Sequence, residues 1–173
     1  MSIKRDLALG SSGELLVLDI FKKADIDSGL VGEKATRSFY DLYCHLNNEK
    51  KFIEVKNDIY ATRSGNIAIE IYNPKSCKPS GISITKSDFW VHILNTKDVY
   101  ICKTETLKAF VEKVKPLRVV SVGGDGNSSM VLYTIENIID VIFTNISDLE
   151  PGKLTEKLID IYGTDTRRTT AAS

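Results

Sequence analysis

The sequence predicts an α/β protein in which helices pack on a mixed β-sheet. Apolar residues recur at helical spacing in residues 11–24 and again after Thr104, and three segments between them alternate as β-strands do. With 173 residues, 42% of them hydrophobic and 27% charged, the chain is long enough for one domain with its own core. We therefore expect a single domain over residues 1–162.

The expected elements follow one another without a linker or an internal repeat. The first two-thirds predict a helix at residues 11–24, a loop at 25–33, strands at 38–46, 51–57 and 66–72, a loop at 75–81, one helical turn at 85–89, and strands or a hairpin at 90–94 and 99–102. A helix from Thr104 to Pro116 closes a core of about residues 10–116. The order is α-β-β-β followed by a strand or hairpin and a helix.

The remaining residues predict a small β-rich C-terminal extension. It consists of a hairpin of residues 118–122 and 130–133 and a helix from about Ile135, within residues 117–162. The glycine-rich segment 123–127 has no GK[ST] sequence and lies between two strands, so it indicates a hairpin turn and not a phosphate-binding loop. Residues 163–173 are polar and are expected to form a disordered tail.

Composition and charge set limits on the class of protein. No apolar run is long enough to cross a bilayer and the N-terminus lacks a secretory signal, so we expect a cytoplasmic protein without membrane partners. The three cysteines have no CxxC spacing, which predicts reduced thiols and neither a disulfide frame nor a zinc site. The formal net charge of zero gives no global attraction to nucleic acid, so any such contact needs a local patch.

The predicted strand 51–57 carries two charged residues on one face. Because side chains alternate along a strand, Phe52, Glu54 and Lys56 point to one side and Ile53 and Val55 to the other. A carboxylate and an ammonium two residues apart on a strand suit chemistry at a phosphate, although an isolated Glu-x-Lys is common by chance.

The preceding strand supplies a second carboxylate. A short hairpin would place Asp41 beside Glu54, and two carboxylates so close repel each other unless a cation lies between them. Hard oxygen ligands with open positions suit Mg²⁺. Lys56 would then orient an attacking water and stabilise negative charge that develops at phosphorus. The alternative for Asp41 is a hydrated strand end.

Two further acids are candidates with open alternatives. Glu14 shares a helix face with Leu18 and is expected to point toward the sheet, but Ser11-x-x-Glu14 also fits a capping box. Glu70, in the third strand, is expected to form a wall of the site or to be an ordinary exposed acid.

Glu14, Asp41, twelve intervening residues and then Glu54-Val55-Lys56, in this element order, resemble the PD-(D/E)XK nuclease superfamily. The resemblance covers residues 11–116 and departs from the pattern at Tyr40, which stands in the place of the name-giving proline. It implies a restriction-endonuclease-like core of the order α-β-β-β-α-β, a mixed sheet flanked by helices. It also implies Mg²⁺-dependent hydrolysis of DNA, with Mn²⁺ as a substitute. Asp41, Glu54, the Val55 carbonyl and Glu14 would bind metal, and Asp41, Glu54, Lys56 and Glu14 would be catalytic.

The segment 78–90 looks like the one that follows the third strand in small phage and bacterial nucleases of this superfamily, where it shapes the rim of the site. This likeness makes Ser80, Thr85 and Lys86 candidates for contact with DNA phosphates. Lys75 and Lys78 belong to a local excess of lysines that could also contact DNA. The alternative is a connecting loop that packs the edge of the sheet.

The resemblance implies a compact enzyme of the phage type. We expect a structure-specific endonuclease with branched DNA, above all the Holliday junction of DNA recombination, as its substrate, acting as a homodimer that makes two symmetric cuts. If phage-encoded, it would work in the host cytoplasm. The alternatives are a restriction-type or repair endonuclease and a non-catalytic DNA-binding or assembly protein that keeps the nuclease fold.

Overall fold

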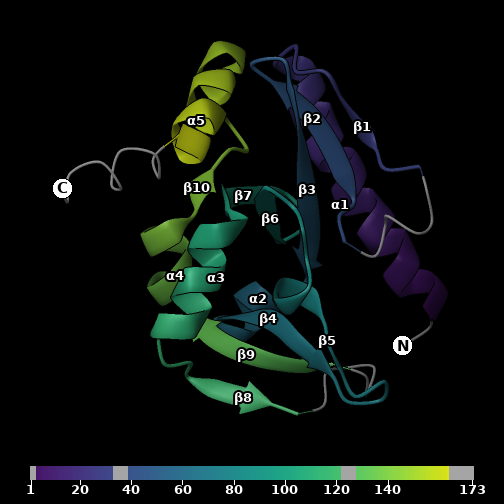
Figure 1. The fold of residues 1–173 in the computed structure, drawn as a ribbon, viewed down its shortest axis with the longest axis vertical. Helices are drawn as coiled ribbons and strands as arrows, with labels where there is room; N and C mark the ends of the chain where they lie inside the picture. The colour runs from purple at the N-terminus through teal and green to yellow at the C-terminus, as the bar shows by residue number, and fades with distance from the viewer. Residues whose placement is uncertain (1–2, 33–38, 122–127, 164–173) are drawn as a thin grey trace.

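The computed structural model describes residues 3–32, 39–121 and 128–163. In chain order the helices and strands are α1 (Ile3–Lys23), β1 (Ser28–Leu30), β2 (Leu42–Leu46), β3 (Glu49–Asp58), α2 (Ala61–Ser64), β4 (Asn66–Asn73), β5 (Lys78–Pro79), η1 (Gly81–Ser83), β6 (Phe89–Leu94), β7 (Asp98–Lys103), α3 (Thr104–Lys113), β8 (Arg118–Val120), β9 (Ser129–Thr134), α4 (Ile135–Ile142), β10 (Thr144–Asn145) and α5 (Pro151–Gly163). Figure 1 shows their arrangement.

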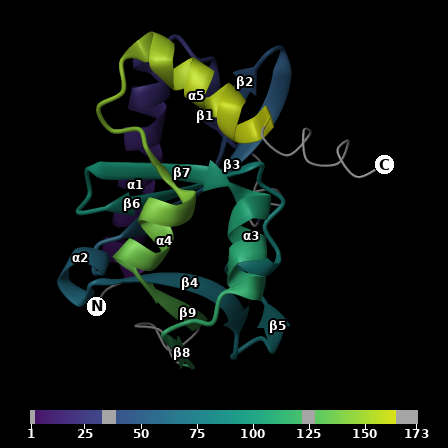
Figure 2. The same cartoon turned by 90° about the vertical axis from the view of Figure 1, so that its left-hand side faces the viewer.

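The strands form two sheets. A six-stranded mixed sheet has the order β1-β2-β3-β6-β7-β10, in which only β3 and β6 run parallel. A four-stranded antiparallel sheet has the order β5-β4-β9-β8. Helices α3 and α4 stand between the two sheets, as Figure 2 shows. The α/β class predicted from the sequence is therefore confirmed, with two sheets in place of the expected one.

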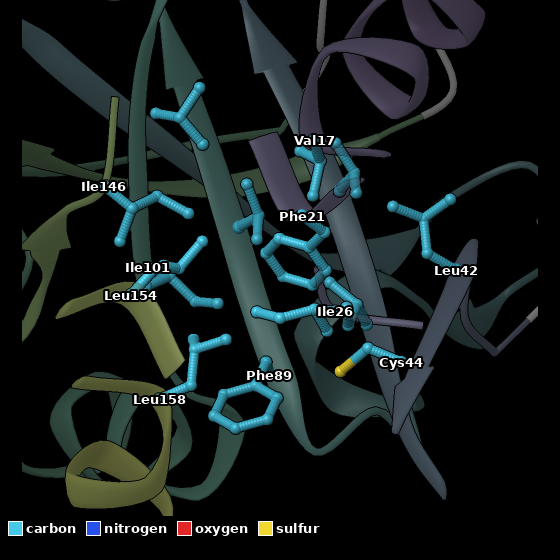
Figure 3. Close-up of a cluster of buried hydrophobic side chains, with 14 of the residues drawn as sticks. Val17, Phe21, Ile26, Leu42, Cys44, Phe89, Ile101, Ile146, Leu154 and Leu158 are labelled. Carbon is cyan, nitrogen blue, oxygen red and sulfur yellow. The ribbon is translucent and has the colours of Figure 1, made fainter. Parts of the chain in front are cut away.

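Each face of the six-stranded sheet packs against a different core. On one face, residues such as Ile53 and Phe89 pack against α1 through Val17 and Phe21 and against α5 through Leu158 (Figure 3). On the other face, a second cluster joins the sheet to α3, α4 and the four-stranded sheet, and Trp90 is its largest fully buried side chain. Burial of the apolar side chains in these two clusters is the main contribution to the stability of both layers.

The third predicted strand, residues 66–72, does not pair with the second predicted strand. After β3 the chain leaves the six-stranded sheet, and β4 pairs with β9 from the last third of the chain. Its place beside β3 is taken by β6, so that Glu54 neighbours Trp90 in parallel register. The alternation of Ile67 and Ile69 reveals a buried face, but it does not tell which sheet that face belongs to.

Several predicted boundaries were also wrong. Helix α1 starts eight residues before Ser11, at Ile3, so Ser11 is no N-cap and the capping-box alternative for Glu14 falls away. The helical turn predicted at 85–89 lies instead at Gly81–Ser83, and the predicted loops contain the short strands β1 and β5. The single helix expected from Ile135 is two helices, α4 and α5.

The C-terminal elements complete both sheets and are more than an added hairpin. Strand β9 pairs with β4, β10 pairs with β7, and α5 contributes Leu154 and Leu158 to the first core. The predicted turn 123–127 and the tail 164–173 lie outside the described residues, as does Ser38. Among the described helices none combines the length and hydrophobicity needed to cross a membrane.

Candidate active site

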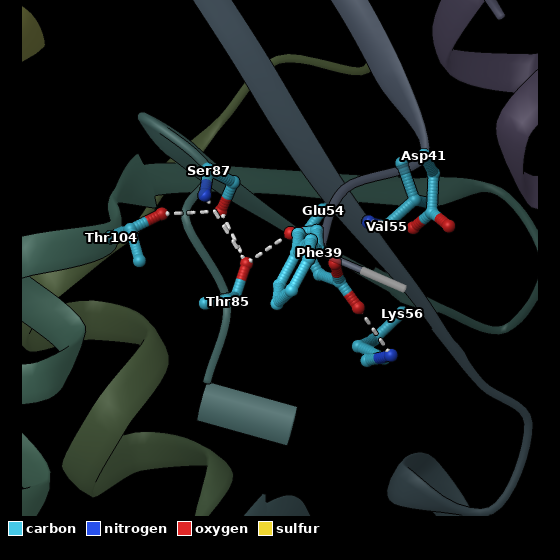
Figure 4. Close-up of polar contacts among 8 residues, drawn as sticks. All are labelled: Phe39, Asp41, Glu54, Val55, Lys56, Thr85, Ser87 and Thr104. Atoms are coloured by element: carbon cyan, nitrogen blue, oxygen red, sulfur yellow. Dashed lines mark hydrogen bonds and ion pairs between the residues drawn. The ribbon is translucent and has the colours of Figure 1, made fainter. Parts of the chain in front are cut away.

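Strand β3 presents Glu54 and Lys56 on the face that looks toward the four-stranded sheet. Glu54 Oε1 lies 2.6 Å from Lys56 Nζ, and the two side chains are labelled in Figure 4. The Glu54 side chain is 11% exposed and that of Lys56 37%. The Lys56 ammonium also lies 5.7 Å from the centre of the Trp90 ring. Strand parity therefore predicted this pair, one member buried and the other open to solvent.

Asp41 lies directly before β2 and next to Glu54. The antiparallel register pairs Leu42 with Ile53, and one further step places Asp41 beside Glu54. The Asp41 N–H donates to the Ile53 carbonyl at 2.8 Å, and Asp41 Oδ2 accepts a hydrogen bond from the Val55 N–H at 2.8 Å. This second bond, which the sequence did not indicate, holds the carboxylate at the edge of β3.

Glu70 approaches the same site from the four-stranded sheet. Its charge is the smallest of the effects that raise the pKa values of Glu54 and Lys56. That Glu70 forms a wall of the site stays a prediction. Gly81 packs directly behind it with a φ of +54°, and a Cβ at this position would lie 2.3 Å from the Glu70 carbonyl oxygen. Glycine is thus required where η1 turns against β4.

The environment of Glu54 disfavours its charged form. Burial raises the pKa of its carboxyl above the ordinary 4.5, and the negative charges of Asp41 and Glu70 raise it further. The charge of Lys56 and its hydrogen bond oppose these effects but do not cancel them. The negative charges of three acids therefore act on one ammonium and exceed its charge.

Lys56 is held as a cation. Burial works to lower the pKa of its ammonium, but the charges of Glu54, Asp41 and Glu70 outweigh it, and the net result is a pKa above 10.5. A lysine in this state donates hydrogen bonds and stabilises negative charge. It is not available to accept a proton.

The donor set fits a hard divalent cation. Mg²⁺ prefers a few carboxylates together with waters and phosphate oxygens, and the unbalanced charge around Glu54 is what such an ion would neutralise. Within residues 3–32, 39–121 and 128–163, no three His, Cys, Asp or Glu side chains already converge as a metal-binding group. An ion would therefore have to draw Asp41 and Glu54 together, with the Val55 carbonyl and waters completing its shell.

Glu14 is not brought together with this cluster. It lies on α1, which packs on the opposite face of the six-stranded sheet, where its neighbour Gly13 comes close to Ile93 and Asn57. Glu14 is partly buried, as predicted, but the pKa shifts of Glu54 and Lys56 arise from Asp41, Glu70 and each other. The structure therefore argues against Glu14 as a ligand.

Thr85 is an internal anchor. It is 3% exposed, its hydroxyl donates to the Phe39 carbonyl at 2.7 Å, and its Oγ1 lies 3.0 Å from Ser87 Oγ. Ser87 Oγ in turn lies 2.9 Å from Thr104 Oγ1, so that these hydroxyls tie residues 85–88 to β7 and α3 (Figure 4). These bonds argue against the predicted phosphate contact for Thr85 and favour the alternative of a packed connection.

The other rim candidates differ in position. Lys86 is exposed, and its ammonium lies 4.5 Å from the centre of the Phe39 ring, near the site. Lys75 and Lys78 are exposed at the β4–β5 turn and on β5. Ser80 is half-buried, and its Oγ belongs to the few buried side-chain atoms in the described part of the chain that have no hydrogen-bond partner.

A second polar pair lies further along the same face of β3 and was not predicted. Asp58 Oδ2 is 3.5 Å from Nε2 of His92, whose side chain is 1% exposed. The sequence contained a signal for it, because Glu54, Lys56 and Asp58 have the same parity on β3. His92 could not be placed without knowing that β6 runs beside β3.

Comparisons with family models, with curated proteins and with solved structures give no match to this chain.

Proposed function

We propose that this protein is a Mg²⁺-dependent endonuclease of the PD-(D/E)XK type that hydrolyses phosphodiester bonds in DNA. The observation that carries the proposal is the arrangement of Asp41, Glu54 and Lys56 on two neighbouring strands, with Glu54 buried and its charge incompletely compensated. A purely structural ion pair between Glu54 and Lys56 has no need for two further acids, Asp41 and Glu70, whose charges act on it.

In this proposal each residue has a distinct task. Asp41 and Glu54 would hold Mg²⁺ together with the Val55 carbonyl, and Mn²⁺ would substitute for it. The ion would supply Lewis-acid stabilisation of the phosphoryl oxygens and a more acidic water. The Val55 N–H fixes Asp41, which keeps that carboxylate in place before the ion arrives.

Lys56 would act on the phosphate. Its ammonium, on a side chain that is 37% exposed, can donate to a phosphoryl oxygen or orient the attacking water, and its raised pKa keeps it charged throughout the neutral range. Because Glu54 Oε1 is paired with Lys56 at 2.6 Å, substrate and ion would have to share or replace that contact.

Branched DNA, with the Holliday junction as the preferred case, is the proposed substrate, and a homodimer is the proposed form. A compact chain that pairs with a second copy makes two symmetric cuts. A restriction-type or repair activity is the alternative. Competition between a four-way junction and linear duplex in a gel-shift assay separates these alternatives, because a junction enzyme retains the junction under excess linear DNA.

The direct test is cleavage of plasmid and junction DNA in Mg²⁺ by the wild type, Glu54→Gln and Lys56→Met. We expect each substitution to lower the cleavage rate by about 10²–10³-fold, the usual cost of removing one group that stabilises the transition state. Glu112→Gln, the same chemical change on the exposed side of α3, serves as the matched control and should cleave as the wild type does. Wild-type protein without metal-dependent cleavage, or variants that cut equally well, would overturn the assignment.

One observation favours a second candidate, a DNA-binding or assembly protein without catalysis. In the described residues the acids do not form a ready metal-binding group, and Lys56 already neutralises part of Glu54. For this candidate we expect DNA binding that is indifferent to Mg²⁺ and unaffected by Glu54→Gln. For the nuclease, divalent cations strengthen DNA binding and Glu54→Gln removes that effect.

A further inference from the structure

A cavity of about 400 Å³ lies beside the candidate active site, where β6 begins and β7 ends. Its walls are residues 85–88, the junction of β7 with α3 at residues 103–105, Lys108 of α3 and Tyr162 of α5. We call this cavity the lysine pocket. Neither the proposed metal site nor the rim residues predicted from the sequence, apart from Thr85 and Lys86, are part of it.

Three lysines face the pocket, namely Lys86, Lys103 and Lys108, against the two acids Asp88 and Glu105. Both acids are engaged: Asp88 Oδ2 accepts the Phe52 N–H at 2.7 Å, and Glu105, 74% exposed, lies 3.5 Å from Lys103. The pocket therefore has an excess of positive charge, although the chain as a whole is neutral. This is the local patch that DNA binding by a neutral protein requires.

The polar groups of the pocket are fixed in place. Lys108 Nζ donates to the Thr85 carbonyl at 2.9 Å, and the buried hydroxyls of Thr85, Ser87 and Thr104 form a continuous chain. The first turn of α3 opens onto the same cavity, and its N-cap, Lys103, provides no side-chain cap. Because these hydroxyls are engaged with one another, the donors open to a phosphate group are the ammonium groups and the first turn of α3.

The pocket is coupled to the proposed active site through two contacts. The Asp88 N–H donates to the Phe52 carbonyl at 2.7 Å, and Phe52 precedes Glu54 by two residues, roughly 7 Å along the strand. Thr85 Oγ1 donates to the carbonyl of Phe39, two residues before Asp41.

We propose that the lysine pocket binds a phosphate of the DNA strand, next to the bond that Glu54 and Lys56 would cut. The inference rests on the proposed function for its position relative to that bond. The volume falls in the usual range of small-molecule sites, roughly 300–1,000 Å³, which leaves room for a phosphate with its sugar. The phosphate is either an internal one of the strand or a terminal 5′-phosphate.

The test is DNA binding measured by fluorescence anisotropy in EDTA, so that no cleavage occurs. The pocket variant is Lys86→Gln/Lys103→Gln, and Lys86→Gln alone serves where Lys103 is needed for folding. Lys108 is left intact because it holds the Thr85 carbonyl. The matched control Lys97→Gln/Lys113→Gln removes the same charge at exposed positions, at the far end of the β6–β7 hairpin and the C-terminal end of α3.

We expect the double pocket variant to bind duplex DNA more weakly, with a salt slope lower by about 1, since the loss of one phosphate contact removes roughly 0.9 from the slope. The control pair should leave that slope within about 0.5 of the wild type by the same relation. An unchanged slope in the pocket variant, or an equal loss in the control pair, would overturn the proposal. Duplexes that end in a 5′-phosphate or in a 5′-hydroxyl separate the internal from the terminal phosphate. A site for a terminal phosphate binds the 5′-phosphate duplex more tightly, whereas a site for an internal phosphate binds both duplexes alike.

The outcome is separable from that of the proposed function. Cleavage by the wild type together with undiminished binding by the pocket variant refutes the pocket alone. Weakened binding by the pocket variant together with no cleavage by the wild type in Mg²⁺ refutes the catalytic assignment alone. A wild type that binds no DNA in EDTA, at low salt, refutes the pocket, and cleavage in Mg²⁺ then decides the catalytic assignment separately.

Discussion

The two faces of β3 lie in different environments. Ile53 and Val55 point into an apolar core closed by α1 and α5, whereas Glu54, Lys56 and Asp58 point toward the second sheet among charged and polar groups. Both faces contain buried side chains, yet those of the apolar face make packing contacts only. The other keeps a carboxylate at a pKa above its ordinary value.

Under the proposed function, one strand serves stability and catalysis at once. The period of two residues along a strand assigns alternate positions to separate environments, so the apolar residues hold the backbone that positions the charged ones. Substitutions on the apolar face should act on folding, and substitutions at Glu54 and Lys56 should act on metal and DNA.

The largest effect on stability is expected on the apolar face. Ile53→Ala should lower the free energy of unfolding by about 2–5 kcal/mol, because the fully buried side chain leaves a cavity between β3, α1 and α5. Denaturant unfolding monitored by circular dichroism measures it. A loss under about 1 kcal/mol would mean that this core is not close-packed as described.

A smaller loss of unfolding free energy is expected on the charged face, at the pair of Asp58 with His92. Asp58→Asn should cost about 1–3 kcal/mol, because it removes a charged partner from buried His92. Burial works to raise the pKa of Asp58, but the hydrogen bond and charge of His92, with further backbone donors, bring it below the ordinary 3.8.

The pH dependence of this difference follows from the lowered pKa. A carboxylate of lowered pKa stabilises the fold above its unfolded value and loses that contribution as the pH falls through its folded value. The gap between wild type and Asp58→Asn should therefore be full above about pH 4 and close below it. Unfolding curves from pH 7 down to pH 3 test this, and a gap that widens on acidification would contradict it.

The smallest effect, and one of opposite sign, is expected at Glu54. Because its folded pKa lies above 4.5, the wild type is favoured at acidic pH and loses stability as the pH rises through the folded pKa. Glu54→Gln avoids that loss, so it should be slightly more stable than the wild type at neutral pH and equal to it near pH 4. Thermal unfolding at both pH values, with Glu112→Gln as the control, measures the difference. A variant less stable than the wild type at neutral pH would show that the ion pair outweighs the repulsion.

The sequence predicted the local pattern of the site better than the long-range pairing. Alternation within residues 51–57 predicted correctly which side chains share a face, and the short turn predicted that Asp41 comes next to Glu54. Both depend on contacts between residues close in the chain. The partnership of β3 with β6 and of β4 with β9 joins segments more than thirty residues apart, and apolar periodicity does not identify such partners.

The same distinction explains the outcome for the candidate ligands. The charge of Glu70 acts on Glu54 because the chain crosses from β3 to the other sheet and returns at β6. Glu14 lies away from this face, because α1 covers the opposite one. Helical spacing predicted correctly that Glu14 is partly buried, but it carries no information about which face of the sheet the helix covers. The sequence did not predict Lys103 and Lys108 of the lysine pocket. They lie far from residues 85–88 in the chain and join them in one cavity only in the folded structure.

The measurement that tests the central claim most directly is a calorimetric titration of the protein with Mn²⁺ at neutral pH. The claim is that the charged face of β3 holds a divalent cation between Asp41 and Glu54. We expect the wild type and Glu112→Gln to bind Mn²⁺ alike. Asp41→Asn and Glu54→Gln should bind it at least ten times more weakly, since loss of even an outer-shell partner costs about 10–100-fold. A wild type that binds no Mn²⁺, or acid variants that bind it as tightly as the wild type, would contradict the claim.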